Sequence, residues 1–254
     1  MVGAGGTTVW RPCCGCGAVY PPYCMGLSGM EMGRCMTFGR TAAGLVAMAL
    51  MVVPAGAQEA DPVKAALEAA ADAAAVNKAG DLLRDPATPV LGNPAGDVVL
   101  VKFVDYQCPY CKAVEPKLDK LLMDDKGVKL IVKEFPILGP ESVVAAKVAL
   151  AAAKQGKYAA FHQALMAYRG KLTSDVTFGT AKDLGLDVER LKRDMNAPDV
   201  TDQLLANFNL ARALKISLTP GYVVNTHVLS GVSVKTMTGQ IDFPVEIKAA
   251  RARK

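Results

Sequence analysis

Two cysteines, Cys108 and Cys111, enclose Pro109 and Tyr110 directly after an apolar run that begins at Val98. A helical pattern follows, so the pair is expected at the start of a helix that leaves a buried strand. Unpaired backbone N–H groups and the positive end of the helix dipole favour a thiolate there, with a pKa well below about 8.5. The proline suits the first turn because it has no N–H to lose. The spacing predicts a reactive dithiol, in which Cys108 attacks and Cys111 resolves a mixed disulfide.

The same pair could be half of a metal site or an inert disulfide. The chain has seven cysteines, but the other five lie within residues 1–35, and the only histidines are His162 and His227. Neither histidine stands at a metal-ligand spacing from the pair, and His162 lies on an apolar helical face that is typical of a core. We therefore expect a redox site without a metal or a cofactor.

Composition sets the class of protein. The chain has 254 residues, of which 51% are hydrophobic, which is enough for one sizeable core. Its formal charge is only +5, and charges of both signs are interspersed along it. A nucleic-acid-binding surface would concentrate Lys and Arg, so no nucleic-acid partner is expected.

Residues 36–57 resemble a secretory leader. They contain Arg40, an apolar stretch at 41–53 and a small-residue cleavage pattern that ends at Ala57. The apolar stretch is shorter than the roughly 20 residues that cross a membrane. Residues 1–35 have no apolar periodicity and are expected to be an unstructured extension upstream of the true start. A zinc knuckle built from their cysteines is disfavoured, since the paired spacing and a histidine are missing.

The remaining chain divides into a helical N-terminal segment, residues 58–87, and a main domain, residues 88–254. In the main domain a strand, the cysteine-bearing helix and a second strand form a βαβ unit. A block of helices at about 140–215 follows, and then two short strands and a helix. This order predicts an α/β, thioredoxin-like fold with a helical insertion between its βαβ and ββα halves.

The motif Phe-Val-Asp-Tyr-Gln-Cys-Pro-Tyr-Cys, the insertion and the later Thr-Pro resemble the secreted DsbA-like proteins of the thioredoxin superfamily. Glutaredoxins share Cys-Pro-Tyr-Cys but are short and have no such insertion. The resemblance implies that Pro220 is a cis-proline that faces Cys108, and that Thr219 offers backbone hydrogen bonds to a substrate peptide. It also implies cysteine-containing secreted proteins as substrates and a membrane redox partner.

Two positions depart from the pattern of the family. Leu218 stands where the family commonly has Gly, so the loop before Pro220 is expected to be tighter or more apolar. The other is Lys102. Six residues before the first cysteine the superfamily usually has a buried acid, whereas this chain has Lys102. A buried lysine would favour thiolate if it stayed charged. We expect instead that its amine reaches the solvent at the edge of the sheet. Asp105 or Glu134 could then replace the missing acid.

The function expected from these features is that of a periplasmic thiol–disulfide oxidoreductase. A disulfide isomerase or reductase that a membrane donor keeps reduced is the alternative among enzymes. A copper- or thiol-binding carrier is the alternative that is not an enzyme. Relatives on the isomerase side of the family oligomerise through an N-terminal segment, which indicates a possible homo-oligomer through residues 61–84.

Overall fold

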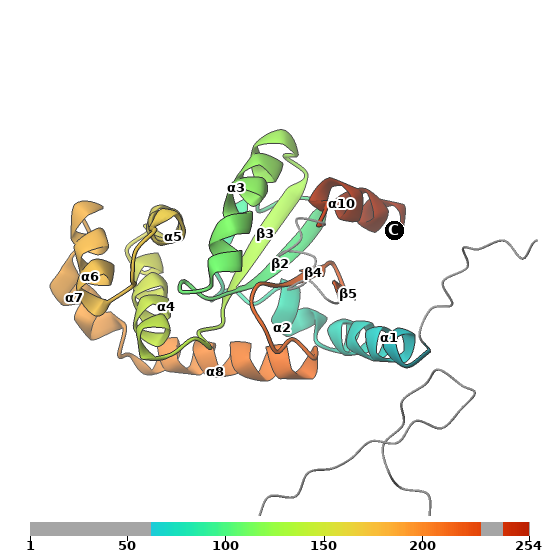
Figure 1. Cartoon of the computed structure of the whole chain (residues 1–254), viewed down its shortest axis with the longest axis horizontal. Coiled ribbons are helices and arrows are strands. Elements are labelled where there is room, and N and C mark those ends of the chain that lie inside the picture. Colours follow the sequence, from blue (N-terminus) through green and yellow to red (C-terminus); the bar gives the residue numbers. More distant parts are fainter. Residues whose placement is uncertain (1–61, 230–240, 254) are drawn as a thin grey trace, which may run out of the picture. The chain divides into compact units, whose positions relative to one another are not determined.

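The computed structural model describes residues 62–229 and 241–253 (Figure 1). The predicted extension at 1–35 and the predicted leader at 36–57 lie outside these residues. None of the described helices is both long enough and apolar enough to span a bilayer.

A mixed five-stranded sheet lies at the centre of the domain, in the order β1-β3-β2-β4-β5. Strands β2 and β3 run parallel, and every other neighbouring pair is antiparallel. The strands are β1 (Val90–Gly92), β2 (Val98–Val104), β3 (Val128–Glu134), β4 (Gly221–Val224) and β5 (His227–Val228). The central strand β2 is the apolar run that leads to the cysteines.

Helices cover both faces of the sheet, which explains why β2 and β3 are apolar almost without interruption. On one face Leu100 and Val104 pack with helix α3 (Pro109–Asp124) and helix α10 (Phe243–Ala252). On the other face Val101 and Phe103 pack with residues of α1 (Pro62–Asn77), α2 (Ala79–Leu83) and α8 (Pro198–Ala213). Because successive strand residues point to opposite faces, β2 contributes to both cores.

The predicted helical insertion is present between β3 and β4. Helices α4 to α7 pack together beyond one end of the sheet, and α8 returns along its face (Figure 1). Asp187 caps α7, and Thr173 caps α6, each by accepting a backbone N–H. The helices are α4 (Pro140–Ala153), α5 (Tyr158–Ala167), α6 (Ser174–Asp183), α7 (Val188–Asp194) and α8 (Pro198–Ala213). The predicted thioredoxin-like fold with a helical insertion is confirmed.

The N-terminal helix α1 (Pro62–Asn77) docks on the edge strand β5, whereas α2 (Ala79–Leu83) packs on the face of the sheet against β2. The Asp72 carboxylate accepts the backbone N–H of Val228 and contacts Nδ1 of His227, both at 2.7 Å. A backbone donor of the short edge strand β5 thereby finds a partner. Only the second half of α1 is attached in this way, because its buried residues are Ala71 and Ala75.

A second attachment lies beneath α2. The buried Lys133 of β3 donates to the Asp81 carbonyl at 2.9 Å, to Asp85 at 3.0 Å and to the Thr88 hydroxyl at 2.7 Å. These three acceptors occupy all three donors of the ammonium group. Lys133 therefore fixes the segment between α2 and β1 to the sheet.

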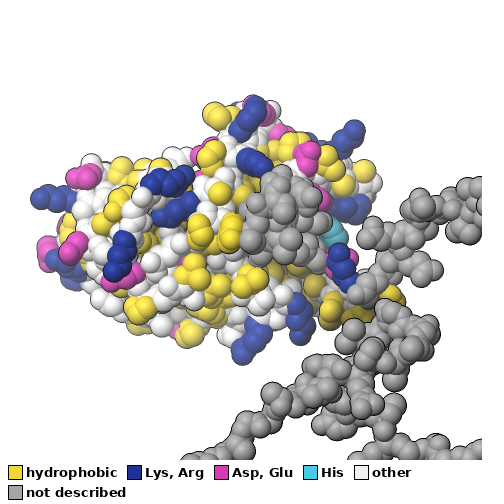
Figure 2. Space-filling model, viewed as in Figure 1, with side chains coloured by type: hydrophobic (Ala, Val, Ile, Leu, Met, Phe, Trp, Pro, Cys, Tyr) yellow, Lys and Arg dark blue, Asp and Glu magenta, His cyan; other side chains and the backbone are white. Residues whose placement is uncertain are grey.

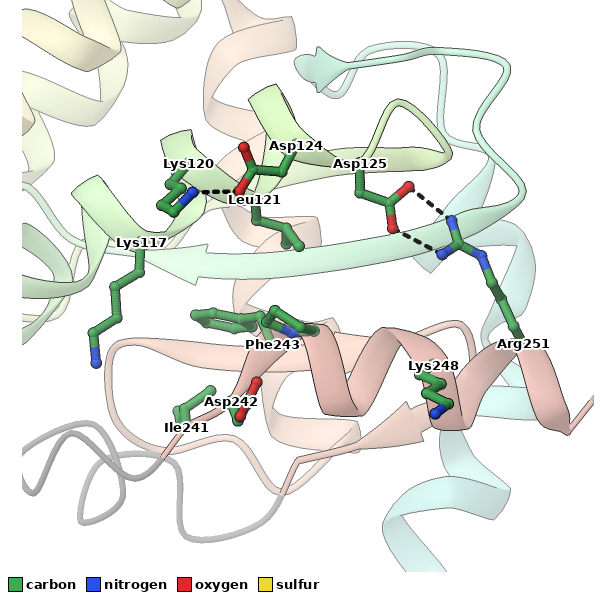
Figure 3. Close-up of a pocket in the computed structure, with 11 residues that line it drawn as sticks. Lys117, Lys120, Leu121, Asp124, Asp125, Ile241, Asp242, Phe243, Lys248 and Arg251 are labelled. Carbon is green, nitrogen blue, oxygen red and sulfur yellow. Dashed lines mark hydrogen bonds and ion pairs between the residues drawn. The ribbon is translucent and has the colours of Figure 1, made fainter.

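At the far end of α3 a pocket of about 520 Å³ separates this helix from α10 (Figure 3). Its apolar lining includes Leu121 and Phe243. Beside it Arg251 forms paired hydrogen bonds with Asp97 and with Asp125, at 2.7 to 2.9 Å. This arginine therefore ties α10 to the loops that flank β2 and α3. On the molecular face of Figure 2 the charges of both signs are interspersed.

Candidate active site

Cys108 lies at the N-cap of α3 and Cys111 one turn further along, and both carry free thiols. The Cys108 backbone is extended, at φ −71° and ψ 115°, so its sulfur turns back over the first turn of the helix. There Sγ accepts the backbone N–H of Cys111 at 3.4 Å. Both thiols are buried, with exposed fractions of 3% for Cys108 and 0% for Cys111.

The two thiols differ sharply in acidity. A hydrogen bond from the Cys111 thiol, helped by backbone N–H groups of the first turn, lowers the pKa of Cys108 to about 6 despite its burial. Burial raises the pKa of Cys111 well above its ordinary value. Near neutral pH Cys108 is therefore largely a thiolate, and Cys111 is a thiol. This difference in acidity is what the predicted roles require, in which Cys108 attacks and Cys111 resolves the mixed disulfide.

The Thr219–Pro220 segment faces Cys108 across the site. The Thr219 carbonyl oxygen lies 3.2 Å from Cys108 Sγ and accepts a hydrogen bond from the thiol when it is neutral. The peptide bond between Thr219 and Pro220 is cis, and both residues are buried. The fold thus brings together two motifs that are 112 positions apart in the sequence. Pro109 and Tyr110 lie at the surface beside them.

The expectation that Lys102 reaches the solvent is wrong. Its side chain is fully buried and forms an ion pair with the carboxylate of Glu115, which is itself 5% exposed. Although burial acts to raise it, the Lys102 ammonium lowers the pKa of Glu115 to about 2. The Glu115 carboxyl therefore stays ionised within the core, with Lys102 as its partner.

A buried polar chain extends from this ion pair towards the insertion. Nε2 of His162 lies 3.2 Å from Glu115, and Nδ1 lies 2.9 Å from the Tyr106 hydroxyl. Glu134 accepts hydrogen bonds from the hydroxyl of Tyr106 at 2.9 Å and from the hydroxyl of Tyr158 at 2.6 Å. His162 is thus a core residue, as its apolar helical face predicts, and burial lowers its pKa.

Asp105 does not serve as the missing acid. Its carboxylate accepts four hydrogen bonds of 2.7 to 2.9 Å, from the backbone of Gln107, Ile137 and Leu138 and from the Ser142 hydroxyl. It therefore shapes the turn before the cysteines and the loop after β3.

Glu115 is a buried acid that the sequence pattern did not single out. Glu134, which it did, is also buried and lies at the other end of the polar chain. Glu115 stands four residues after Cys111 in α3, so the two share one face of the helix. Lys102 points towards that face because it lies two residues from Leu100 and from Val104, and every second residue of a strand projects from the same face. The spacing of four residues between Cys111 and Glu115 is the feature of the sequence that indicates that both lie on one face of this helix.

Glu134 makes stability depend on pH. Burial raises the pKa of its carboxyl from 4.5 to about 8. The folded state therefore holds this proton more tightly than the unfolded chain. Its contribution to the free energy of unfolding is fully present below pH 4.5 and is lost as the pH rises to about 8.

We expect Glu134→Gln to remove this contribution while keeping an acceptor for Tyr106 and Tyr158. Urea unfolding at pH 5, 6.5 and 8 measures it. The difference in unfolding free energy between the two proteins should change by several kcal/mol over this range, at about 1.4 kcal/mol per unit of pKa shift. The protein with Glu134 should lose more stability as the pH rises. Parallel curves would show that Glu134 is already ionised at pH 5.

Among the described residues, no cluster of three or more His, Cys, Asp or Glu side chains could hold a metal ion. The thiol pair at the start of a helix and the cis-proline segment opposite it are placed as in thioredoxin-fold oxidoreductases. The model of the DSBA-like thioredoxin domain matches residues 99–242, which is more than half of the chain. The chain belongs to the family of the DSBA-like thioredoxin domain.

Solved structures agree with this assignment. A thioredoxin-like oxidoreductase from Silicibacter pomeroyi is 41% identical, with a TM-score of 0.62 over 68% of this chain and 95% of that one. A periplasmic thioredoxin-like protein from Salmonella enterica serovar Typhimurium is 26% identical, with a TM-score of 0.57 over 68% and 95%.

Curated relatives include a Rickettsia felis protein named for protein-disulfide oxidoreductase activity. It is 26% identical over 179 residues, which are 65% of this chain and 62% of that protein. The chain spans only 21% of the length of the sodium/proton antiporters that it also matches.

Proposed function

We propose that this protein is a periplasmic thiol–disulfide oxidoreductase that forms or exchanges disulfides in secreted proteins through Cys108 and Cys111. The observation that carries the proposal is the asymmetry of the pair. Cys108, with a pKa of about 6, lies opposite Thr219 and Pro220, whereas burial keeps Cys111 protonated. A thiol pair of this kind separates the sulfur that meets the substrate from the sulfur that resolves the intermediate.

In the oxidising direction a substrate thiolate attacks Sγ of Cys108 in the Cys108–Cys111 disulfide. The bond between the cysteines breaks, Cys111 leaves as a thiolate and takes up a proton, and a mixed disulfide forms at Cys108. A second substrate thiolate then attacks the substrate sulfur and releases Cys108. Two electrons have moved from the substrate to the enzyme, and a membrane partner would remove them. The low pKa of Cys108 makes it a good leaving group in the second step.

The ion pair of Lys102 and Glu115 supports this exchange. The positive charge of Lys102 acts on the Cys111 sulfur and favours its thiolate. Cys111 must carry that charge briefly, either as the leaving group or as the attacking sulfur. We propose that Lys102 takes over part of the role that a buried acid has elsewhere in the superfamily, with Glu115 holding it in place.

Apolar side chains around the pair suit an unfolded protein substrate. Tyr110, Leu138 and Leu218 are 36%, 46% and 58% exposed. Tyr110 lies between the cysteines, Leu218 precedes Thr219, and the Leu138 carbonyl accepts a hydrogen bond from Gln107. Exposed apolar residues gathered at a functional site favour contact with another protein. The predicted leader, with cleavage near Ala57, and the periplasmic relative from Salmonella support the proposed compartment.

Oxidase and isomerase or reductase directions differ in reduction potential. The class spans about −270 to −120 mV, and equilibration with glutathione measures the value. A potential in the oxidising half of that span supports the oxidase direction, and one near the reducing end contradicts it. Refolding of scrambled ribonuclease gives a second readout, since an isomerase restores the activity of the ribonuclease and a pure oxidase does not.

The first half of α1 is the proposed site of self-association. It has few contacts with the domain, and Leu67 is 59% exposed on a stripe of small and apolar residues that includes Ala66 and Ala70. Such stripes pair with a second helix. We expect the protein to form a homo-oligomer and Leu67→Glu to reduce it to a monomer in light scattering. Val76→Glu, on another side of α1, is the control and should leave the oligomer intact. A monomeric unsubstituted protein would contradict this proposal.

A further inference from the structure

Tyr222 occupies a place beside the dithiol that neither the motif nor the family assignment explains. It stands in β4, two residues after Pro220, and pairs in register with Lys102 of β2. Residues directly opposite in an antiparallel pair project from the same face of the sheet. Tyr222 therefore points, like Lys102, towards the face that α3 covers.

The ring and the hydroxyl of Tyr222 have different surroundings. The ring is fully buried and packs edge-to-face on Phe243, with 5.0 Å between the centroids. Its hydroxyl is also buried, yet it has no hydrogen-bond partner among the described residues. A phenylalanine would fill the same space without burying an unpaired polar group. Packing alone gives no reason for the hydroxyl.

The hydroxyl lies in the buried cluster that also contains Cys111, on the face of the sheet that α3 covers. Charges on Cys111, Glu115 and Cys108 all bear on it, and together with burial they raise the pKa of Tyr222 well above its ordinary value. The phenol is therefore a neutral O–H donor throughout the working pH range. Lys102 is also on this face, but its ammonium is engaged by Glu115. Within the part of the chain that the structure describes, the O–H of Tyr222 is the donor in this group that has no acceptor when both cysteines are reduced.

We propose that Tyr222 is a catalytic residue whose hydroxyl donates a hydrogen bond to Cys111 Sγ when that sulfur becomes a thiolate. In the dithiol form no acceptor among the described residues, sulfur included, lies within hydrogen-bond distance of this hydroxyl, and a neutral thiol is too weak an acceptor to draw it closer. A thiolate forms a charge-assisted bond, which is stronger. The unpaired hydroxyl thus gains its partner only during exchange, when the charge on Cys111 appears.

The inference rests on the proposed exchange at Cys108 and concerns its second step. With glutathione as the partner, a mixed disulfide first forms at Cys108. Cys111 then loses its proton and attacks Cys108 Sγ. The Cys108–Cys111 bond forms, and glutathione leaves as a thiolate that takes up a proton. Tyr222 stabilises the charge on Cys111 in this step and equally in its reverse, where Cys111 is the leaving group.

Tyr222→Phe keeps the ring and removes only the oxygen. Reduced protein is mixed with oxidised glutathione, samples are quenched with acid, and mass spectrometry follows the mixed disulfide with time. A lost hydrogen bond to a charged group corresponds to about a tenfold or larger change in rate. We expect the mixed disulfide to form at the unsubstituted rate and to resolve about tenfold more slowly. The pH midpoint of resolution should also rise, because the Cys111 thiol loses a group that favours its ionisation.

A matched control is Tyr168→Phe, which removes a hydroxyl from a partly buried tyrosine outside this group and should change neither step. Equal resolution rates and pH midpoints in Tyr222→Phe and the unsubstituted protein would overturn the inference. So would a failure of Tyr222→Phe to fold, which would assign the hydroxyl a structural role. If the unsubstituted protein forms no mixed disulfide at Cys108, the proposed function itself fails.

Discussion

Cys108→Ser is expected to reduce the oxidation of a dithiol peptide to the rate measured without protein. The serine hydroxyl cannot form a disulfide, so neither the mixed disulfide nor the Cys108–Cys111 bond can arise. The loss should be complete although the fold is retained, because a serine side chain can cap α3 as the sulfur does. Circular dichroism and the melting temperature check the fold, and thiol quantification checks the activity.

Cys111→Ser provides the matched control. It keeps the nucleophile and removes only the resolving thiol, so it should accumulate a mixed disulfide at Cys108 that mass spectrometry can locate. This pair of variants assigns the two roles separately. Measurable turnover in Cys108→Ser, or a mixed disulfide that maps to Cys111 in the unsubstituted protein, would refute the assignment.

Lys102→Met is expected to lower the free energy of unfolding by about 3–5 kcal/mol, because it leaves the Glu115 carboxylate buried without its counter-charge. Methionine has a similar length, so the loss of charge is the main change. Urea denaturation near neutral pH measures the effect. The stability of the variant should also depend on pH, since the Glu115 carboxyl would take up a proton at a higher pH once the ammonium is gone.

The double variant Lys102→Met with Glu115→Leu tests the physical reason. Replacing both members of a buried ion pair by apolar groups is often close to neutral, so most of the lost stability should return. A double variant that is as unstable as Lys102→Met alone would show that packing, and not an unpaired charge, causes the loss. A single variant within 1 kcal/mol of the unsubstituted protein would contradict the buried pair.

Local patterns predicted most of the fold. Strands β2 and β3 were visible as apolar runs, and the position of Cys108 at a helix start followed from the strand, the proline and the helical pattern after it. The cis bond before Pro220 came from the resemblance to a family, since no local rule distinguishes this proline from a trans one.

The interactions that the sequence did not reveal join residues on different elements. Lys102 and Glu115 form an ion pair because α3 lies on the face of β2 that carries Lys102. The sequence alone was equally consistent with a Lys102 side chain that reaches the edge of the sheet. Asp72 meets His227 across 155 positions. The unpaired hydroxyl of Tyr222 became visible only when its neighbours were known. Periodicity predicts which face a residue lies on, but not what lies opposite.

Cys108 is the proposed reactive thiolate of this site, and its ionisation can be measured directly. Reduced protein is alkylated with iodoacetamide between pH 4 and pH 10, and the labelled residue is identified by mass spectrometry. The structure predicts that Cys108 reacts with a midpoint near pH 6, whereas Cys111 stays unmodified through neutral pH. A midpoint for Cys108 near the ordinary value of about 8.5, or earlier labelling of Cys111, would contradict the account.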